Sequence, residues 1–180
     1  MVESKRGSAV DEIEALIEGE VITAERAHQI AGQFPALADC IVGWIEVAAA
    51  AGDWHRVVRL ANLAAPLRPS GLGRVLRQLL NLCAADLNKE DLVEILGEIG
   101  TVEAAVDIYR LVERSVESDA PAYWLCQKAM LSLSDLGTDE ARSYLRAMTT
   151  REWPDPIRWH AAVALCVEDE LGFEEDDMLG

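Results

Sequence analysis

Three histidines, at positions 28, 55 and 160, are the first candidates for chemistry in this chain of 180 residues. Histidine ligates metals and acts as a general base near neutral pH. A metal site needs several ligands that converge on one point, and helical ligands share a face when they lie three or four residues apart. No histidine has a second histidine or a cysteine at that spacing. We therefore predict no metal site and a structural or surface role for all three.

The four cysteines, Cys40, Cys83, Cys126 and Cys166, are separated by about forty residues each. They form no C-x-x-C pair, which is the usual beginning of a zinc site or a redox motif. Each lies in an apolar stretch with helical spacing. This context predicts buried free thiols in a reducing cytoplasm, and no disulfide framework.

The segment "PSGLGR", Pro69 to Arg74, has two glycines before an expected helix that begins with an arginine. Helix N-termini bind phosphate, but the segment lacks a preceding strand, a third glycine and a Gly-Lys-Ser/Thr sequence. A turn is the favoured interpretation. Carboxylate pairs such as Glu12 and Glu14 lie on expected solvated faces, where nothing raises a carboxyl pKa for acid/base catalysis. We therefore predict no catalytic residues, no cofactor and no enzyme.

Helices are the elements expected to position these residues. Hydrophobic residues make up 51% of the chain, and they recur at helical spacing, as at Ile13, Leu16 and Ile17. Side chains suited to cap a helix start occur at Ser8, Thr23, Asp53, Asn88, Thr101, Thr138 and Asp155. Glycines suited to a helix end occur at Gly19, Gly52, Gly97, Gly100, Gly137 and Gly172. The expected helices span 8–18, 23–33, 36–51, 54–65, 71–86, 89–97, 101–117, 121–136, 139–149 and 156–171.

Membrane insertion and export are not expected. No apolar run reaches the roughly 18 residues that a membrane-spanning helix needs. The first twenty residues carry charges where a secretory signal has an apolar stretch. The sequence therefore predicts a cytoplasmic protein.

Two segments of the chain resemble each other. The residues Pro121, Trp124, Ala129, Leu136 and Gly137 recur 35 residues later as Pro156, Trp159, Ala164, Leu171 and Gly172. A two-helix unit of this size cannot bury its apolar face alone, so such units stack and share a core. On this interpretation Trp124 and Trp159 fill the same core position in successive units, and Ala129 and Ala164 are buried at equivalent positions.

The segment "DPIRWHAAVAL", Asp155 to Leu165, resembles the second helix of a HEAT repeat. The typical pattern of that helix is Asp-Pro, an apolar residue, Arg, two variable residues, Ala-Ala, one variable residue and Ala-Leu. The resemblance is clearest over 138–172. It implies a short right-handed α-solenoid of antiparallel helix hairpins, in which Asp155 and Arg158 link neighbouring repeats.

The fold class expected from these patterns is all-α, with about ten helices. One solenoid domain spans 1–172, with 1–34 as an N-terminal capping hairpin and 35–172 as stacked helix pairs. Residues 173–180 form an acidic tail. The exposed binding face of such a solenoid is built by its second helices, here 54–65, 89–97, 121–136 and 156–171.

The formal net charge of −16 favours a basic protein partner and makes nucleic acid an unlikely one. The leading hypothesis is a non-catalytic protein–protein binding module, in its sharpest form an immunity protein that covers a basic toxin nuclease. The alternatives are a scaffold or regulatory adaptor and, less favoured, a HEAT-like nucleic-acid glycosylase. Only the arginines between Arg56 and Arg77 support the glycosylase. The sequence leaves the oligomeric state open.

Tryptophans and acidic residues are the candidate contacts with that partner, because tryptophan is enriched at binding hot spots. Trp153 has no counterpart in the repeat. The tail "FEEDDMLG" is either a disordered solubilising end or an acidic arm with Phe173 and Met178 as apolar anchors. The candidate residues are Trp153, Trp159, His160, Glu90, Glu94, Tyr123, Glu174, Glu175, Asp176 and Asp177.

Overall fold

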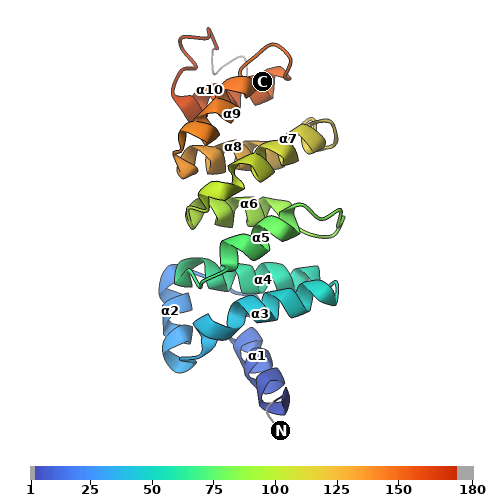
Figure 1. Cartoon of the computed structure of the whole chain (residues 1–180), viewed down its shortest axis with the longest axis vertical. Coiled ribbons are helices and arrows are strands. Elements are labelled where there is room, and N and C mark those ends of the chain that lie inside the picture. Colours follow the sequence, from blue (N-terminus) through green and yellow to red (C-terminus); the bar gives the residue numbers. More distant parts are fainter. Residues whose placement is uncertain (1–2, 174–180) are drawn as a thin grey trace. The chain divides into compact units, whose positions relative to one another are not determined.

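The computed structural model describes residues 3–173, and over this range the chain is helical and contains no strand (Figure 1). The expected all-α class is confirmed. The helices are α1 (Glu3–Ile17), α2 (Ala24–Gln33), α3 (Leu37–Ala50), α4 (Trp54–Ala64), the 3-10 helix η1 (Ala65–Leu67), α5 (Leu72–Leu80), α6 (Lys89–Glu98), the 3-10 helix η2 (Val102–Ala104), α7 (Ala105–Asp119), α8 (Trp124–Leu136), α9 (Asp139–Met148) and α10 (Asp155–Leu165).

Most of the predicted helix starts are capped as expected. The side chains of Thr23, Asp53, Asn88 and Thr138 each accept a hydrogen bond from a backbone N–H in the first turn of the following helix. Three starts differ from the prediction. Thr101 precedes the 3-10 helix η2, but its side chain makes no capping hydrogen bond. The first helix begins at Glu3 rather than after Ser8, and α10 has Pro154 in the capping position, so that Asp155 is its first helical residue.

Two helix ends differ from the prediction by six residues. The helix expected to reach residue 86 ends at Leu80, where Asn81 turns its side chain to the Arg77 carbonyl (3.1 Å). The helix expected to reach residue 171 ends at Leu165, because Cys166 adopts a left-handed backbone with φ 58°. The backbone N–H of Val167 bonds the Ala162 carbonyl at 3.0 Å, the pattern with which glycine usually closes a helix.

The described chain divides into two compact units. Unit 1 comprises the described residues up to Val75 together with Ala84–Leu87, and unit 2 comprises Leu76–Cys83 together with the described residues from Asn88 onward. Helix α5 therefore contributes one part to each unit. The expected grouping into a single stacked domain with a capping hairpin stays a prediction.

Unit 1 has its core between α3 and α4, which pack against each other, while α2 contacts η1. Aliphatic side chains of α1, α2, α3 and α4 are withdrawn from solvent there. They include Ile13, Ile30, Ile41, Ile45, Val57 and Leu60, all fully buried.

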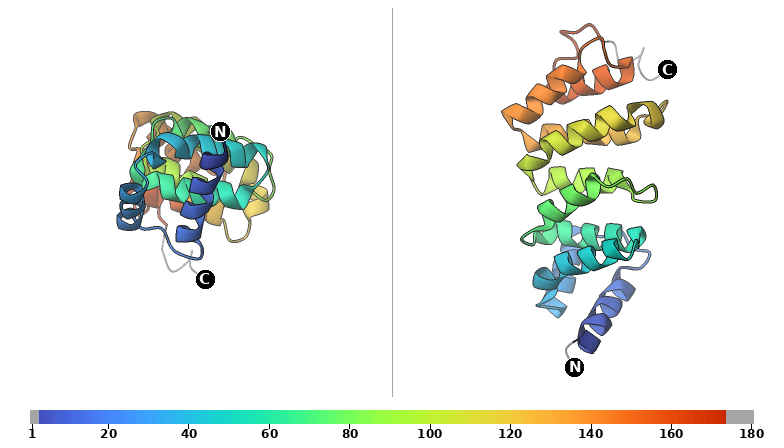
Figure 2. Two further views of the ribbon diagram at one scale, coloured as in Figure 1. Left: turned by 90° about the horizontal axis from the view of Figure 1, so that it is seen from below. Right: turned by 45° about the vertical axis from the view of Figure 1, so that its right-hand side comes forward.

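Unit 2 is centred on α8, which contacts α6, α7, α9 and α10 (Figures 1 and 2). A β-carbon at Gly97 of α6 would lie 2.9 Å from the β-carbon of Ser132 on α8, so the two backbones approach very closely. Four residues earlier on α8, Lys128 contacts Glu94 of α6. The contacts advance together along both helices, so α6 and α8 run in the same direction.

The 35-residue repeat does not coincide with structurally equivalent positions. Trp124 is the first residue of α8 and its exposed fraction is 66%, whereas Trp159 is the fifth residue of α10 and is half-buried. The expectation of one shared core position was therefore wrong. Ala129 is buried as predicted, but Ala164 is only half-buried, and the buried alanines of α10 are Ala161 and Ala162.

Candidate functional site

Six of the predicted partner-binding residues lie in unit 2. Glu90 and Glu94 belong to α6, Tyr123 precedes α8, Trp153 lies between α9 and α10, and Trp159 and His160 belong to α10. The remaining four, Glu174, Glu175, Asp176 and Asp177, lie outside the described residues.

The glutamates of α6 form a row along one side of the helix. Glu90, Glu94 and Glu98 are four residues apart and are at least partly exposed, a spacing that places side chains on one helix face. Lys128 of α8 approaches this row, with Nζ 2.8 Å from Glu94 Oε2 and 4.0 Å from Glu90 Oε2. The hydrogen bond to Glu94 raises the pKa of Lys128. One cation therefore faces two carboxylates of the row, Glu90 and Glu94.

Exposed apolar side chains continue this surface on α8. Trp124 and Leu131 have exposed fractions of 66% and 52%, and they flank Lys128 at helical spacing. The sequence did not indicate that either residue is exposed, and the repeat placed Trp124 in the core. We name this surface the α6–α8 face, and it consists of Glu90, Glu94, Glu98, Trp124, Lys128 and Leu131.

Trp153 belongs to an aromatic cluster rather than to the α6–α8 face. The rings of Tyr109 and Tyr144 stack with centroids 4.5 Å apart, and Trp153 meets the edge of Tyr109 at 6.2 Å. Tyr109 lies on α7 and Tyr144 on α9, so this cluster joins two helices of unit 2 to the loop before α10. Trp153 therefore packs against α7, and its predicted role in partner binding stays a prediction.

Trp159 and His160 are neighbours on α10, with ring centroids 4.8 Å apart. Both are half-buried, and burial lowers the pKa of His160. The adjacent Arg158 binds the Asp155 carboxylate and donates to the Thr149 carbonyl at 3.3 Å, which joins α10 to the end of α9. Its guanidinium also lies 5.1 Å from the centre of the Phe173 ring. Phe173, expected to anchor a partner, therefore contacts the protein's own arginine.

Tyr123 has a left-handed backbone, with φ 52°, at the entry to α8. The cap of α8 comes from Asp119, whose carboxylate accepts hydrogen bonds from the backbone N–H groups of Leu125 (3.4 Å) and Cys126 (2.8 Å). Burial, and then the hydrogen bond with Asp119, raise the pKa of Cys126. The predicted start of this helix at residue 121 did not include its cap, because Asp119 lies several residues before Trp124, where α8 begins.

Four arginines of the segment 56–77 contact partners within their own units: Arg56, Arg59, Arg74 and Arg77. Arg56 binds Asp11 and Glu14, and Arg59 donates to the Glu14 backbone carbonyl at 2.7 Å. The remaining two pairs are Arg74 with Glu46 and Arg77 with Asp107. These contacts oppose the use of the segment as a phosphate-binding surface, because carboxylates already neutralise most of it.

The cysteines differ in burial. Cys126 is buried as predicted, whereas Cys40 is half-buried and Cys83 and Cys166 are exposed. The last two lie just beyond the early ends of α5 and α10, where the chain leaves the core. Among residues 3–173 no three His, Cys, Asp or Glu side chains are grouped so that they could hold a metal ion.

Within the same described range, no individual helix is long and apolar enough to cross a bilayer, and α2 and α3 pass that criterion only as a pair bent by 105°.

Comparisons of the chain with protein-family models, with curated proteins and with solved structures find no match.

Proposed function

We propose that this protein is a non-catalytic binding module, a HEAT-like α-solenoid that holds a basic protein partner against the α6–α8 face. The observation that carries the proposal is the row of three glutamates on α6 beside the exposed Trp124 and Leu131 of α8. In its sharpest form, the module is an immunity-type inhibitor that covers the active site of a basic enzyme such as a toxin nuclease.

The contacts within unit 2 support the solenoid part of the proposal. In stacked helix pairs, each second helix contacts the second helices before and after it. Helix α8 contacts both α6 and α10, and α7 contacts α9. The common direction of α6 and α8, given by the Glu94–Lys128 and Gly97–Ser132 contacts, is the direction expected of successive second helices.

The chemistry of the face supports a basic protein partner. Binding hot spots are enriched in aromatic side chains, and a surrounding ring of charge steers the encounter and selects the partner. Trp124 supplies an exposed aromatic side chain, and the glutamates supply charge of the sign that a basic surface requires. The net charge of the whole chain has the same sign.

A capture experiment with charge-neutral variants tests the proposal. The double variant Glu90→Gln/Glu94→Gln removes two charges from the face, and Glu103→Gln/Glu117→Gln removes two exposed charges on η2 and α7. We expect wild type and Glu103→Gln/Glu117→Gln to retain the same basic protein from cells that express the protein together with its partner. We expect Glu90→Gln/Glu94→Gln to lose that protein. Equal retention by both variants, or an acidic partner, contradicts the proposal.

The effect on the captured partner separates an inhibitor from an adaptor. Stoichiometric suppression of nucleic-acid cleavage by the partner supports the immunity form. Unchanged partner activity in a stable complex favours the scaffold or regulatory adaptor, which is the second candidate function. The HEAT-like glycosylase is the weakest alternative, because the arginines it requires are paired with carboxylates such as Glu14 and Asp107.

A further inference from the structure

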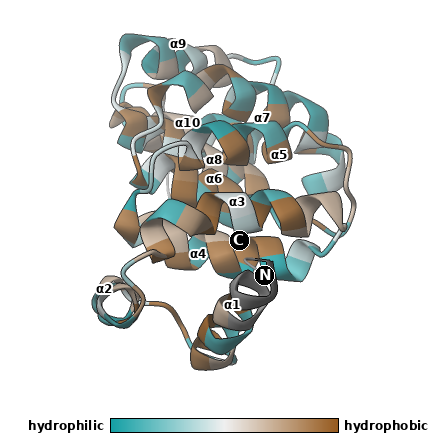
Figure 3. Ribbon diagram, turned by 60° about the horizontal axis from the view of Figure 1, so that its bottom comes forward, coloured by the Kyte–Doolittle hydropathy of each residue, from teal (hydrophilic) through white to brown (hydrophobic). Residues whose placement is uncertain are grey.

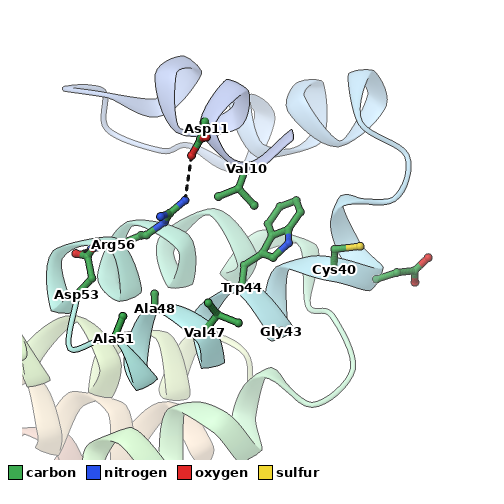
Figure 4. A pocket seen from close by; sticks show the side chains of 11 residues that line it. Val10, Asp11, Cys40, Gly43, Trp44, Val47, Ala48, Ala51, Asp53 and Arg56 are labelled. Carbon is green, nitrogen blue, oxygen red and sulfur yellow. Dashed lines mark hydrogen bonds and ion pairs between the residues drawn. The ribbon is translucent and has the colours of Figure 1, made fainter. Parts of the chain in front are cut away.

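An open groove of about 600 Å³ lies in unit 1 between α1 and the α3–α4 pair (Figure 4). One side is formed by Val10 of α1, and the other by α3, from which Trp44 projects toward Val10 in Figure 4. The volume is within the range of roughly 300–1,000 Å³ that is typical of small-molecule sites. No part of the α6–α8 face contributes to this groove.

The walls of the groove are apolar because α3 carries hydrophobic residues beyond its buried side. Ile41 and Ile45 face the core of unit 1 and are fully buried. Val47 has an exposed fraction of 70% and lines the groove with the half-buried Trp44. Hydrophobic colour accordingly covers much of α3 in Figure 3. A water-filled apolar surface of this kind gains free energy when a hydrophobic ligand covers it.

The charged residues around these walls are mainly acidic. Asp11, Asp39 and Asp53 line the groove, and among the lining residues whose side chains the structure describes, Arg56 is the only basic one. The Arg56 atom Nη2 lies 3.4 Å from Asp11 Oδ1 (Figure 4) and 2.8 Å from Glu14 Oε2. The arginine charge is therefore balanced, and the groove keeps an excess of carboxylates.

We infer that this groove binds a small organic cation, an amine or ammonium group attached to an aromatic or branched apolar body. The apolar body fits against Val10, Val47 and the Trp44 ring, and the cation lies near the aspartates. An indole face also attracts a cation directly, by on the order of 1 kcal/mol. Among the described lining residues an anion meets the aspartates, and the one basic side chain, Arg56, is already paired with Asp11 and Glu14.

Two probes that share a naphthylmethyl body and carry opposite charges test the inference in the full-length protein. We expect 1-naphthylmethylammonium to bind saturably and to shift the Trp44 indole N–H signal in a ¹H–¹⁵N NMR titration, with that signal assigned from a Trp44→Phe variant. We expect 1-naphthylacetate to bind at least tenfold more weakly. The preference for the cation decreases with added salt, because salt screens exposed charges.

Matched substitutions locate the binding. Val47→Arg places a cation and a long side chain in the groove, whereas Val21→Arg makes the same change at a residue whose exposed fraction is 89% and which does not line it. We expect the first variant to weaken binding of the amine at least tenfold and the second to leave it unchanged.

Three results overturn the inference: no saturable binding of the amine, equal affinity for the two probes, or unchanged affinity in Val47→Arg. Binding of a basic amphipathic peptide without binding of the amine also overturns it, because the groove then recognises a polypeptide.

Discussion

Two helix contacts, one in each unit, are built from opposite kinds of side chain. In unit 2, α6 and α8 meet through Gly97 and Ser132, with so little space that a methyl group at position 97 would reach 2.9 Å from its neighbour. In unit 1, α1 meets α4 through Arg56 and Arg59, which reach across to Glu14. Small residues let the backbones of two helices approach closely, whereas long polar side chains keep the helices farther apart.

The difference explains where each unit offers a surface for binding. The close approach of α6 and α8 leaves no room for a side chain at Gly97, so the side chains of the α6–α8 face lie outside this contact. The spaced contact in unit 1 leaves the groove of about 600 Å³ beside α3. A protein partner suits the first arrangement and a small ligand suits the second, because small-molecule sites are concave and protein interfaces are broad.

The largest expected difference between the units is the contribution of an arginine–aspartate pair to the free energy of unfolding. The two pairs are Arg77–Asp107 in unit 2 and Arg56–Asp11 in unit 1. Asp107 has an exposed fraction of 7% and binds Arg77 Nε at 2.6 Å and Asn81 Nδ2 at 2.9 Å. Asp107→Ala removes the carboxylate from Arg77 and leaves Asn81 with the Arg77 carbonyl alone, and it should lower the free energy of unfolding by about 2–3 kcal/mol.

The matched change in unit 1 is Asp11→Ala. The Asp11 side chain is 74% exposed, and exposed ion pairs contribute roughly 0–1 kcal/mol. Urea unfolding followed by tryptophan fluorescence measures both variants. Similar losses for the two would show that the Asp107 pair is no more protected from water than the Asp11 pair.

A glycine-to-alanine change should have opposite signs in the two units. Gly97→Ala places a β-carbon 2.9 Å from Ser132, and overpacking of this kind costs about 1–3 kcal/mol. At Gly43 of α3, no atom of a neighbouring group lies within 4 Å of an added β-carbon. Gly43→Ala should therefore stabilise the protein, by up to about 1 kcal/mol from helix propensity. Thermal unfolding of both variants checks the signs, and stabilisation by Gly97→Ala would show that α6 and α8 are not in close contact.

Local features of this fold were predictable from the sequence, and contacts between distant residues were not. The caps at Thr23, Asp53 and Thr138 were correct because a cap bonds an amide only two or three residues away. The close approach of Gly97 and Ser132 joins residues on different helices, and no local pattern reveals it. The prediction instead placed Gly97 at a helix end.

The repeat illustrates why residue identity is a weaker guide than helix position. The matched residues lie 35 apart, but α8 begins at Trp124 and α10 begins at Asp155, 31 residues apart. The difference is about one helical turn. It displaces each matched residue along its helix, which is why Trp124 and Trp159 occupy different environments.

The candidate site was found in part. Glu90 and Glu94 were predicted from their charge, and they lie together on α6. The apolar neighbours Trp124 and Leu131 were missed, because exposure on one side of α8 depends on how α8 packs against four other helices. The groove in unit 1 left no signal in the sequence except the excess of apolar residues in α3.

A smaller difference between the units concerns pH. His28 and His55 of unit 1 are exposed, whereas His160 of unit 2 is half-buried, and burial lowers its pKa below the ordinary value of 6.5. The unfolded chain therefore takes up the proton first as the pH falls. The neutral ring contributes stability above pH 6.5 that is lost as the pH decreases toward the pKa of the folded state.

The measurement is the urea midpoint at pH 7.5 and pH 5.5. We expect His160→Gln to reduce the drop in stability between these two conditions. His55→Gln makes the same substitution at an exposed histidine and is the matched control. An identical drop in wild type and His160→Gln would show that the His160 ring is fully hydrated.

Metal removal should have the smallest effect, and the same effect on both units. Cys126, the buried cysteine, has its pKa raised by burial, which disfavours the thiolate form that binds metals. Within residues 3–173 no other side chains gather to complete a site. A structural metal contributes directly to folding free energy, so dialysis against a chelator should leave the melting temperature unchanged. A decrease of many degrees that added zinc reverses would show that metal ligands converge in one of the units. Urea unfolding of Cys126→Ser would then locate them. Loss of the zinc effect in this variant would place the ligands in unit 2.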